Sequence, residues 1–502
     1  MVTSARDYHF ATSYDRNHMK AHHLDWPNQP TVFKTYEGVE QIPLPEVSQF
    51  PETYFWRLNK TKPPSSTDNI LNIELVSKIF TLSYSLTAKR RLPGGYEFHY
   101  RSVASAGALY PAELYLAARS VEGLESGVYH YGIYRRTLTP LRRGDPWQAV
   151  EKATLESEVE KASAWFFVTG IFFRSAWKYR ARAFRYVLLD AGHLLENLVL
   201  ALKAFNLFFS IHYDFRDDEV AELLGLDQKK EGCFACVTVH GKSAAVFPGG
   251  EVKKLPETFL QASCVSNREV TYDEILSCYQ AGIQPIERKK TNTDLIQSLG
   301  VAPESWKNLP GCKPKKTEMK YPKVIFRRRS KRNFVNQELG LDKFLHLLNL
   351  VADALEQNFV PGHPGSWPLA CGFLTGNIED TLSGFYLLDP LNRRIGLVGK
   401  GTLVHKMASV CLDQEWLGNA SLHFLLMTNL QEIDQTWGPR GYRYAMLAAG
   451  RIGQSIYLGA TELGLGCCGI GALYDEEARQ LLGLNKESAL LYLVAAGPVK
   501  RL

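Results

Sequence analysis

The chain contains an internal repeat, and this repeat limits the architecture more than any other feature of the sequence. The segment that begins at Arg185 aligns without a gap with the segment that begins at Arg443, at an offset of 258 residues. Residues 185–227 and 443–485 share 13 identical residues in 43 positions, whereas unrelated sequences would share about three. The sequence therefore predicts two related halves.

Each copy of the repeat predicts a long helix, a short crossing segment and a second helix that ends at Gly225 or Gly483. A strand-like apolar run follows in both copies, CFACVTVHG in the first and ALLYLVAAG in the second. Further strands are expected at 114–118, 165–170 and 421–427. This order of elements predicts an α+β fold in which a helix-flanked sheet is present twice.

Composition divides the chain into four segments. Residues 1–50 lack a strong hydrophobic period, and we expect them to form an arm laid over the body of the protein. Residues 252–320 are rich in Lys, Pro and Thr, which indicates a linker that contains some short helix. The two halves then occupy residues 51–251 and 321–502.

Charge, hydropathy and cysteine content exclude several classes of protein. The 502 residues carry a net charge of only +6, which does not require a nucleic acid partner, although it suits an anionic ligand. The N-terminus is polar, and no uncharged apolar run reaches about 18 residues, so neither a secretory signal nor a membrane span is predicted. Nine scattered cysteines favour reduced thiols and a cytoplasmic location.

Small residues gather in the stretch RSVASAGALYPAELY, from Arg101 to Tyr115. Its centre is Ser105, Ala106 and Gly107. Small side chains let a backbone approach a flat or charged group, to which hydroxyl and amide groups can then donate hydrogen bonds. A tight turn in the core would have the same composition, and the stretch alone does not separate the two interpretations.

A basic segment, FRRRSKRNF, begins the second half. In an extended chain, Arg328, Ser330 and Arg332 would share one face. Two guanidinium groups with a hydroxyl between them suit a phosphate group. The alternative is a solvated basic patch or a nucleic-acid-binding run.

Glycines and a basic tail close the chain. The stretch LGLGCCGIGALYDEE includes Gly466 and Gly469, and glycine permits close approach of the backbone to a planar ring. Lys500 and Arg501 follow the last predicted strand and would complete an anion site. Neither piece has the spacing of a Walker A motif or of a dinucleotide-binding fingerprint.

Together these motifs resemble the nitroreductase-like flavoproteins, and more specifically SagB/ThcOx-type dehydrogenases in a tandem form. RRSKR resembles the Arg-x-Ser-x-Arg motif of that family. RSVASAGALYPAELY resembles its Pro-Ser-x-Gly loop, with Ala104 where the family has Pro. FRSAWKYRARAFRY resembles the segment that carries a Lys-Tyr pair, here Lys178 and Tyr179. The first residues of the chain resemble the N-terminal arm of the family.

The resemblance implies an FMN cofactor, which in such proteins lies at the interface of two subunits. Here the two halves of one chain would take the place of those subunits. The cofactor-binding residues that the resemblance implies are Arg328, Ser330, Arg332, Ser105, Ala106, Gly107, Gly466, Gly469, Lys500 and Arg501.

The two halves differ in a way that predicts one FMN per chain. At the offset of 258, Gly466 faces Phe208, which would fill the space that a ring needs. The first half also lacks the Arg-x-Ser-x-Arg motif. The second half has a degraded small-residue loop, PGHPGSWPLACG, and carries Thr436 and Trp437 where the first half has its Lys-Tyr pair. The intact motifs of the halves are therefore complementary.

The resemblance also implies catalytic roles for Lys178 and Tyr179, with proton removal as the expected task. A pair on a helix surface is the alternative. We therefore expect an FMN-dependent oxidoreductase that acts on an azoline-like or related small or peptidic substrate. Two alternative hypotheses are an NAD(P)H-dependent nitro- or quinone-reductase and a non-enzymatic flavin-binding or scaffold protein. No metal site is expected, and a homodimer and a separate peptide-binding partner are left open.

Overall fold

The structure is a computed structural model, and it divides the chain into two compact units. It describes residues 2–19, 22–66, 69–91, 97–154, 162–241, 255–283, 295–312, 319–357 and 368–500. The N-terminal unit comprises His23–Pro51 and Thr61–Pro285. The C-terminal unit comprises Met1–His22, Glu52–Lys60 and Ile286–Leu502.

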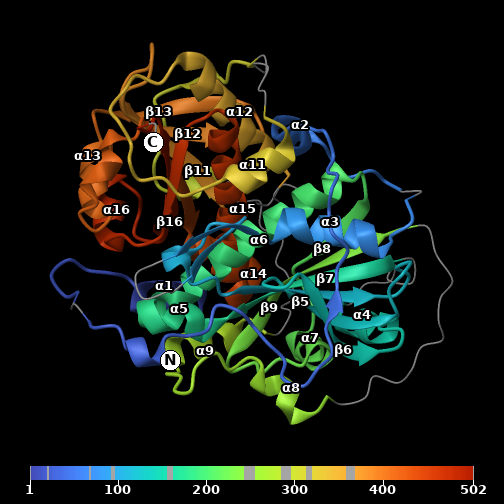
Figure 1. The fold of residues 1–502 in the computed structure, drawn as a ribbon. Coiled ribbons are helices and arrows are strands. Elements are labelled where there is room, and N and C mark those ends of the chain that lie inside the picture. Colours follow the sequence, from blue (N-terminus) through green and yellow to red (C-terminus); the bar gives the residue numbers. More distant parts are fainter. Residues whose placement is uncertain are drawn as a thin grey trace. The chain divides into compact units, whose positions relative to one another are not determined.

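The N-terminal unit is built on an antiparallel sheet. Its strand order is β1-β6-β5-β4-β7-β9-β8, with bounds β1 Ile42–Pro43, β4 Ala112–Ala118, β5 Gly127–Gly132, β6 Thr137–Arg143, β7 Ala162–Ile171, β8 Phe208–His212 and β9 Glu231–His240. The long helix α6 (Ala183–Ala204) packs on β7 and β4, and α3 (Ile73–Ser83) packs against α6 (Figure 1). The other described elements are β2 Leu86–Arg91, β3 Glu97–Arg101, α4 Trp147–Thr154, α5 Phe172–Tyr179, α7 Asp217–Leu224, α8 Glu257–Gln261 and α9 Asp273–Ala281.

The C-terminal unit repeats this architecture. Its strand order is β10-β13-β12-β11-β14-β16-β15, with bounds β10 Trp306–Asn308, β11 Ala370–Thr375, β12 Gly384–Asp389, β13 Arg394–Lys400, β14 Leu422–Asn429, β15 Gly466–Ile470 and β16 Ser488–Gly497. The long helix α15 (Gly441–Glu462) packs on β15 and β16. The other described helices are α1 Ala5–Ala11, α2 Phe55–Lys60, α10 Leu295–Ser298, α11 Tyr321–Arg327, α12 Leu341–Glu356, α13 Val404–Val410, α14 Leu430–Trp437 and α16 Asp475–Leu481.

The internal repeat of the sequence is a repeat of the structure. At the offset of 258 residues, α5 falls on α14, α6 falls on α15 and β8 falls on β15, residue for residue. Both long helices are buried along nearly their whole length, including charged residues such as Asp190 of α6 and Arg451 of α15. The prediction of one α+β architecture present twice is confirmed.

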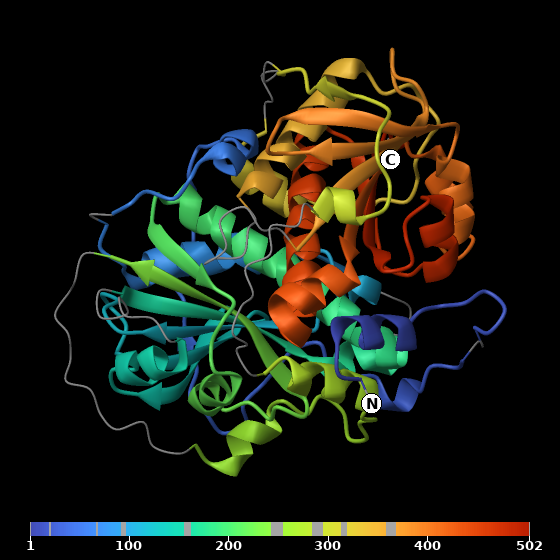
Figure 2. The ribbon, with the colours of Figure 1, turned by 180° about the vertical axis from the view of Figure 1, so that it is seen from behind.

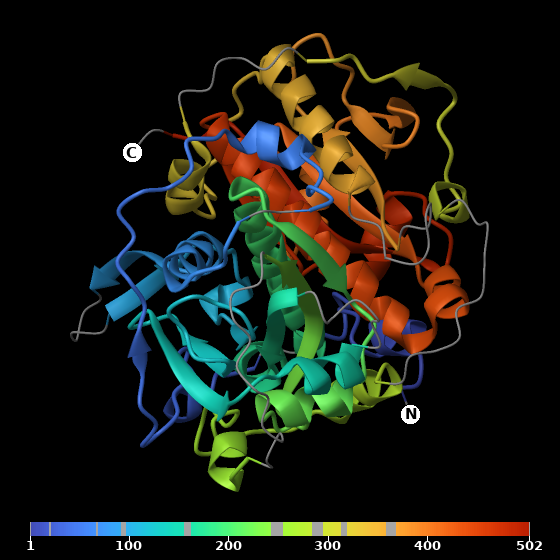
Figure 3. The same ribbon diagram turned by 90° about the vertical axis from the view of Figure 1, so that its right-hand side faces the viewer.

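The predicted N-terminal arm divides between the units. In the C-terminal unit α1 packs beside α14 (Figure 2), and the Arg16 guanidinium pairs with Asp413 and Glu477 at 2.8 Å each. Helix α2, which follows the arm in the sequence and belongs to the same unit as α1, lies beside α12 and α15 (Figure 3). Residues 23–51 instead belong to the N-terminal unit. The arm is therefore a set of separately anchored segments.

The segment predicted as a linker contributes packed elements to both units. In the N-terminal unit, Tyr279 of α9 makes edge contacts with the rings of Phe172 and Phe184. In the C-terminal unit, β10 pairs with β13 as an edge strand of the sheet. The four-segment division of the chain stays a prediction.

A fully buried ion pair holds the second part of the arm in the N-terminal unit. The Lys34 ammonium lies 2.5 Å from the Glu231 carboxylate. This carboxylate also accepts hydrogen bonds from Tyr115, Thr169 and Ser263, at 3.0, 2.6 and 2.8 Å. Burial lowers the pKa of Lys34, but the charge of Glu231 and other anionic partners outweigh burial and leave it raised. A buried charge is stable only when it is paired in this way.

We predict that Lys34→Met lowers the free energy of unfolding by about 3–5 kcal/mol, because it leaves the Glu231 carboxylate buried without its cation. Adding Glu231→Gln should recover part of this loss. Lys89→Met is the matched control, because Lys89 is 62% exposed and its pair with Glu97 is worth about 1 kcal/mol or less. Urea unfolding measures all three, and equal losses for Lys34→Met and Lys89→Met would contradict the prediction.

Candidate functional site

Lys178 and Tyr179 lie beside the small-residue loop of the same unit. They end α5, and both side chains are partly exposed. A Cβ atom added at Gly107 would lie 2.9 Å from the Tyr179 hydroxyl and 3.4 Å from Cδ of Lys178. Gly107 also has φ of 64°, which glycine adopts without strain. The structure therefore brings the predicted Lys-Tyr pair and the predicted loop together, and Gly107 leaves room for them.

The loop is fixed to α6 by a buried carboxyl group. The Ser105 hydroxyl and the Asp190 side chain share a hydrogen bond, and the Ala106 amide donates to Asp190 Oδ1 at 3.3 Å. The Tyr110 amide donates to the Ser105 hydroxyl at 2.9 Å. Burial raises the pKa of Asp190 to about 8, although these hydrogen bonds and the charge of Arg101 act in the opposite direction.

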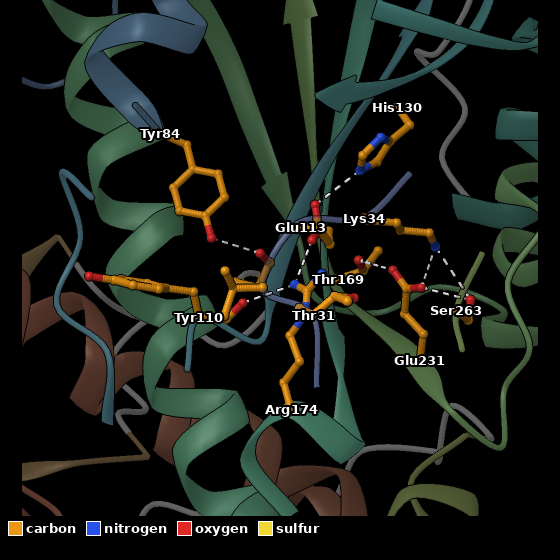
Figure 4. Close-up of polar contacts among 12 residues, drawn as sticks. Thr31, Lys34, Tyr84, Tyr110, Glu113, His130, Thr169, Arg174, Glu231 and Ser263 are labelled. Carbon is orange, nitrogen blue, oxygen red and sulfur yellow. Dashed lines mark hydrogen bonds and ion pairs between the residues drawn. The ribbon is translucent and has the colours of Figure 1, made fainter. Parts of the chain in front are cut away.

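A buried arginine ties the end of the loop to α5 (Figure 4). Arg174 donates to the Tyr110 carbonyl and to the Thr31 carbonyl, each at 2.9 Å, and to the Glu113 carboxylate at 2.5 Å. The other oxygen of Glu113 lies 2.9 Å from His130 Nε2. Burial raises the pKa of Glu113, but the charge of Arg174 and the bond from His130 dominate and hold it at about 2. The carboxylate therefore stays ionised as a structural anchor.

Arg101, which opens the small-residue stretch, is buried among aromatic rings. Its guanidinium carbon lies 4.5 Å from the ring centroid of Tyr110 and 5.0 Å from that of Tyr84. It also donates to the Tyr84 hydroxyl and the Val32 carbonyl. These contacts pair both terminal nitrogens of the guanidinium inside the unit, so Arg101 supports the loop.

The residue after the Lys-Tyr pair has an unusual backbone conformation. Arg180 has φ of 50° and ψ of −137°, a region that favours glycine. The corresponding residue of the C-terminal unit is Gly438, with φ of 59° and ψ of −158°. The N-terminal unit therefore holds an arginine in a strained conformation directly after Tyr179, and such strain gathers at functional sites.

The basic segment and the glycine segment of the C-terminal unit meet at Tyr457 of α15. The Ser330 and Tyr457 hydroxyls are 2.9 Å apart, and the Gly469 amide donates to the Tyr457 hydroxyl at 2.7 Å. The guanidinium carbon of Arg328 lies 5.5 Å from the centroid of the Tyr457 ring. The Lys331 amide donates to the Cys467 carbonyl at 2.9 Å. The predicted phosphate-binding segment and the predicted glycine segment are thus neighbours in one unit.

The end of the chain also joins this group. The Lys500 amide donates to the Asn333 carbonyl, and the Asn333 side-chain amide donates to the Lys500 carbonyl, each at 3.1 Å. Arg332 is exposed, and its guanidinium carbon lies 5.9 Å from the Trp416 ring centroid. Arg501 lies outside the residues that the structure describes. The described cationic residues Arg328, Arg332 and Lys500 therefore belong to connected segments.

The glycines at 466 and 469 have neighbours within their own unit. A Cβ atom at Gly466 would lie 2.1 Å from Val499, and one at Gly469 would lie 1.8 Å from the Tyr492 hydroxyl. These side chains already require glycine at both positions. Contact of either glycine with a cofactor stays a prediction. Burial raises the pKa of both Cys467 and Cys468, which keeps these thiols protonated.

The described parts of the chain contain neither a cluster of metal-binding side chains nor a helix that could span a membrane. No group of three or more His, Cys, Asp or Glu side chains there is placed to hold a metal ion. No described helix combines the length and the apolar character needed to cross a membrane. The degraded loop PGHPGSWPLACG of the second half falls largely on residues 361–367, which lie outside the described residues.

The motifs of the sequence did not indicate the residues that support the predicted site. Asp190, Arg174 and Tyr457 were not singled out, yet each contacts a predicted site residue or its loop. For Asp190 and Arg174 the available signal was a charged side chain in a mainly buried helix, whereas Tyr457 gave no such signal. Arg174 also lies four residues before Lys178, one turn earlier on the same helix.

Comparison with known proteins agrees with this architecture. The model of the Nitroreductase family matches residues 73–242 and 325–498. A protein of Methanocaldococcus jannaschii named as a nitroreductase is 29% identical over 177 residues, 35% of this chain and 89% of its own length. The trifolitoxin-processing protein TfxB of Rhizobium leguminosarum bv. trifolii is 28% identical over 34% of this chain and 48% of its own.

The microcin B17-processing protein McbC of Escherichia coli is 27% identical over 32% of this chain and 59% of its own. The chain thus spans about half the length of the two processing proteins that it matches. A crystal structure described as a nitroreductase from Anabaena variabilis ATCC 29413 covers 99% of both chains, with a TM-score of 0.77 and 24% identity. It shares the whole tandem fold.

These findings confirm the predicted resemblance to tandem nitroreductase-like proteins and to the SagB-type processing proteins. Because the family model matches both halves, the repeat in the sequence is a repeat of the family's domain. An oxidoreductase-like role is the corresponding functional class. The chain therefore belongs to the nitroreductase family and carries the family fold twice.

Proposed function

We propose that the chain is an FMN-dependent oxidoreductase that oxidises an azoline-like ring in a small or peptidic substrate. The observation that carries this proposal is the convergence of Lys178 and Tyr179 on Gly107 of the small-residue loop. The names of two relatives, which process trifolitoxin and microcin B17, support a substrate that is modified by processing. Oxidation of an azoline to an azole removes two electrons and two protons.

The donor groups of the C-terminal unit fit the phosphate of FMN. Arg328 and Arg332 offer guanidinium groups and Ser330 offers a hydroxyl, and these donors match the acceptor oxygens of a phosphate. Arg328 is only 3% exposed, so its charge is less screened by water than that of a surface residue. These residues, with Lys500, would hold the cofactor. Bound FMN would supply the two-electron redox chemistry.

The Lys-Tyr pair would remove a proton from the substrate. The Lys178 ammonium lies 5.5 Å from the centre of the Tyr179 ring, and a nearby cation stabilises negative charge on a phenol oxygen. The Tyr179 hydroxyl faces Gly107, which is exposed and has no side chain. In this arrangement the ionised form of Tyr179 would accept the proton, and Lys178 would stabilise the phenolate before the transfer.

We further propose one FMN per chain, held by groups from both halves. The N-terminal unit has the loop of Ser105, Ala106 and Gly107, and the C-terminal unit has the basic segment. Each unit lacks groups that the other has. The C-terminal unit has Thr436 and Trp437 in place of the Lys-Tyr pair, and the N-terminal unit lacks the Arg-x-Ser-x-Arg motif. The complementary losses support a single site rather than two.

A second candidate function is the reduction of nitro compounds or quinones by NAD(P)H. The name of the M. jannaschii relative favours it. The two functions differ in what reduces the cofactor. Bleaching of bound FMN by NAD(P)H alone would favour the reductase, whereas bleaching by an azoline substrate alone would favour the dehydrogenase.

We predict that Tyr179→Phe and Lys178→Ala each lower the rate of azoline oxidation by about 10²-fold or more, because a general base is removed or loses its cation. Both variants should keep bound FMN. Trp437→Phe is the matched control, since it changes the corresponding position of α14. Product formation followed by mass spectrometry is the measurement, and wild-type rates in both variants would refute the assigned roles.

We predict that Arg328→Ala weakens FMN binding by about 10- to 100-fold, since hydrogen bonds to a charged group contribute about 1.5–3 kcal/mol. Arg327→Ala is the control, because Arg327 is an exposed arginine one residue earlier in the chain. Quenching of FMN fluorescence on titration with apo-protein measures both affinities. Equal affinities for the two variants would remove Arg328 from the phosphate site.

A further inference from the structure

The hydroxyl group of Ser105 has a hydrogen atom whose direction depends on its neighbours. A serine hydroxyl donates one hydrogen bond and accepts two. The Tyr110 amide takes one acceptor position of this hydroxyl at 2.9 Å. Among the residues that the structure describes, the other hydrogen-bond partner of this hydroxyl is Asp190 Oδ2. The protonation state of Asp190 therefore decides what the Ser105 hydrogen does.

The two states of Asp190 have opposite consequences. An ionised carboxylate can only accept, so the Ser105 hydroxyl must donate to it. A protonated carboxyl can donate to the Ser105 oxygen, and the hydrogen of Ser105 is then free to point at another acceptor. The Ala106 amide, which donates to Oδ1 at 3.3 Å, is compatible with both states.

We propose that Asp190 is a positioning residue, and that its protonated form releases the Ser105 hydroxyl hydrogen to an acceptor oxygen of the bound cofactor. The inference rests on the proposed FMN site, because the acceptor would be a carbonyl oxygen of the flavin ring. Asp190 acts only through Ser105 and needs no contact of its own with the ligand.

The surroundings of Asp190 favour the protonated form at neutral pH. The carboxyl is 4% exposed. The charge of Arg101 of β3 acts on it, and the Ser105 hydroxyl and the Ala106 amide form hydrogen bonds with it. Burial outweighs these groups and raises the pKa of Asp190 to about 8. Binding that needs the proton must therefore weaken as the pH rises through this value.

The fold itself does not require this carboxyl group. The corresponding residue of α15 is Ala448, which is 7% exposed in a helix of the same length. Burial of a carboxyl costs free energy unless it is well paired. Its presence only in the unit that carries the small-residue loop indicates a task at that loop rather than in helix packing.

The test is the affinity of the apo-protein for FMN between pH 7 and 9.3, measured by fluorescence quenching. Wild-type protein should lose about tenfold in affinity across this range, as expected for one hydrogen bond. Asp190→Asn should lose this pH dependence, because its amide group always donates to Ser105. Ser105→Ala should bind more weakly at pH 7 and also lack the pH dependence. Asp218→Asn, an exposed carboxyl of α7, should behave as wild type.

Asp190→Asn with the wild-type pH dependence would overturn the inference, as would Ser105→Ala with wild-type affinity at pH 7. A chain that binds no FMN at any pH would refute the proposed function instead. The coupling between Asp190 and Ser105 is tested separately, in the apo-protein, by the ¹³C titration of the Asp190 carboxyl. Ser105→Ala should raise its midpoint, since the hydrogen bond from Ser105 favours the ionised form, and an unchanged midpoint would overturn the inference.

Discussion

The candidate site of the N-terminal unit depends on one buried guanidinium group. Arg174 is fully buried, and a charge in that position is stable only when it is paired and hydrogen-bonded. Its partners come from two segments that are distant in the sequence, namely Thr31 of the arm and the stretch from Tyr110 at the end of the loop to Glu113 of β4. The requirement to satisfy this charge therefore fixes the arm, the loop and the sheet around α5. The same helix ends in the Lys-Tyr pair, so the network also sets where that pair lies.

The two copies of the fold have kept their backbone and changed their chemistry. Helix α14 matches α5 in length and position, but it has Glu432 where α5 has Arg174. Likewise α15 has Tyr457 where α6 has Val199, and this tyrosine joins the basic and glycine segments. A duplicated domain needs only one set of groups for each task, and losses in opposite copies are then tolerated. This pattern supports the proposed single cofactor, to which the copies would contribute different parts.

Much of this could be predicted from the sequence because the repeat has no gap between residues 185 and 227. The apolar runs and the spacing from Arg185 to Arg443 predicted the order of the long helix, the short crossing segment, the second helix and the last strand. The supporting network could not be predicted, because Arg174 and Glu113 are 61 residues apart and their pairing depends on the sheet. The neighbours of the glycines could not be predicted from the sequence either. Gly469 suggested room for a ring, and only the structure shows Tyr492 beside it.

The central claim is that two unlike copies of one fold serve a single cofactor. The number of FMN molecules bound per chain at saturation tests it most directly, by titration of apo-protein with FMN and chemical quantification of the extracted flavin. One FMN per 502-residue chain is the expected result. Two FMN molecules per chain would contradict it, because each copy would then hold a complete site.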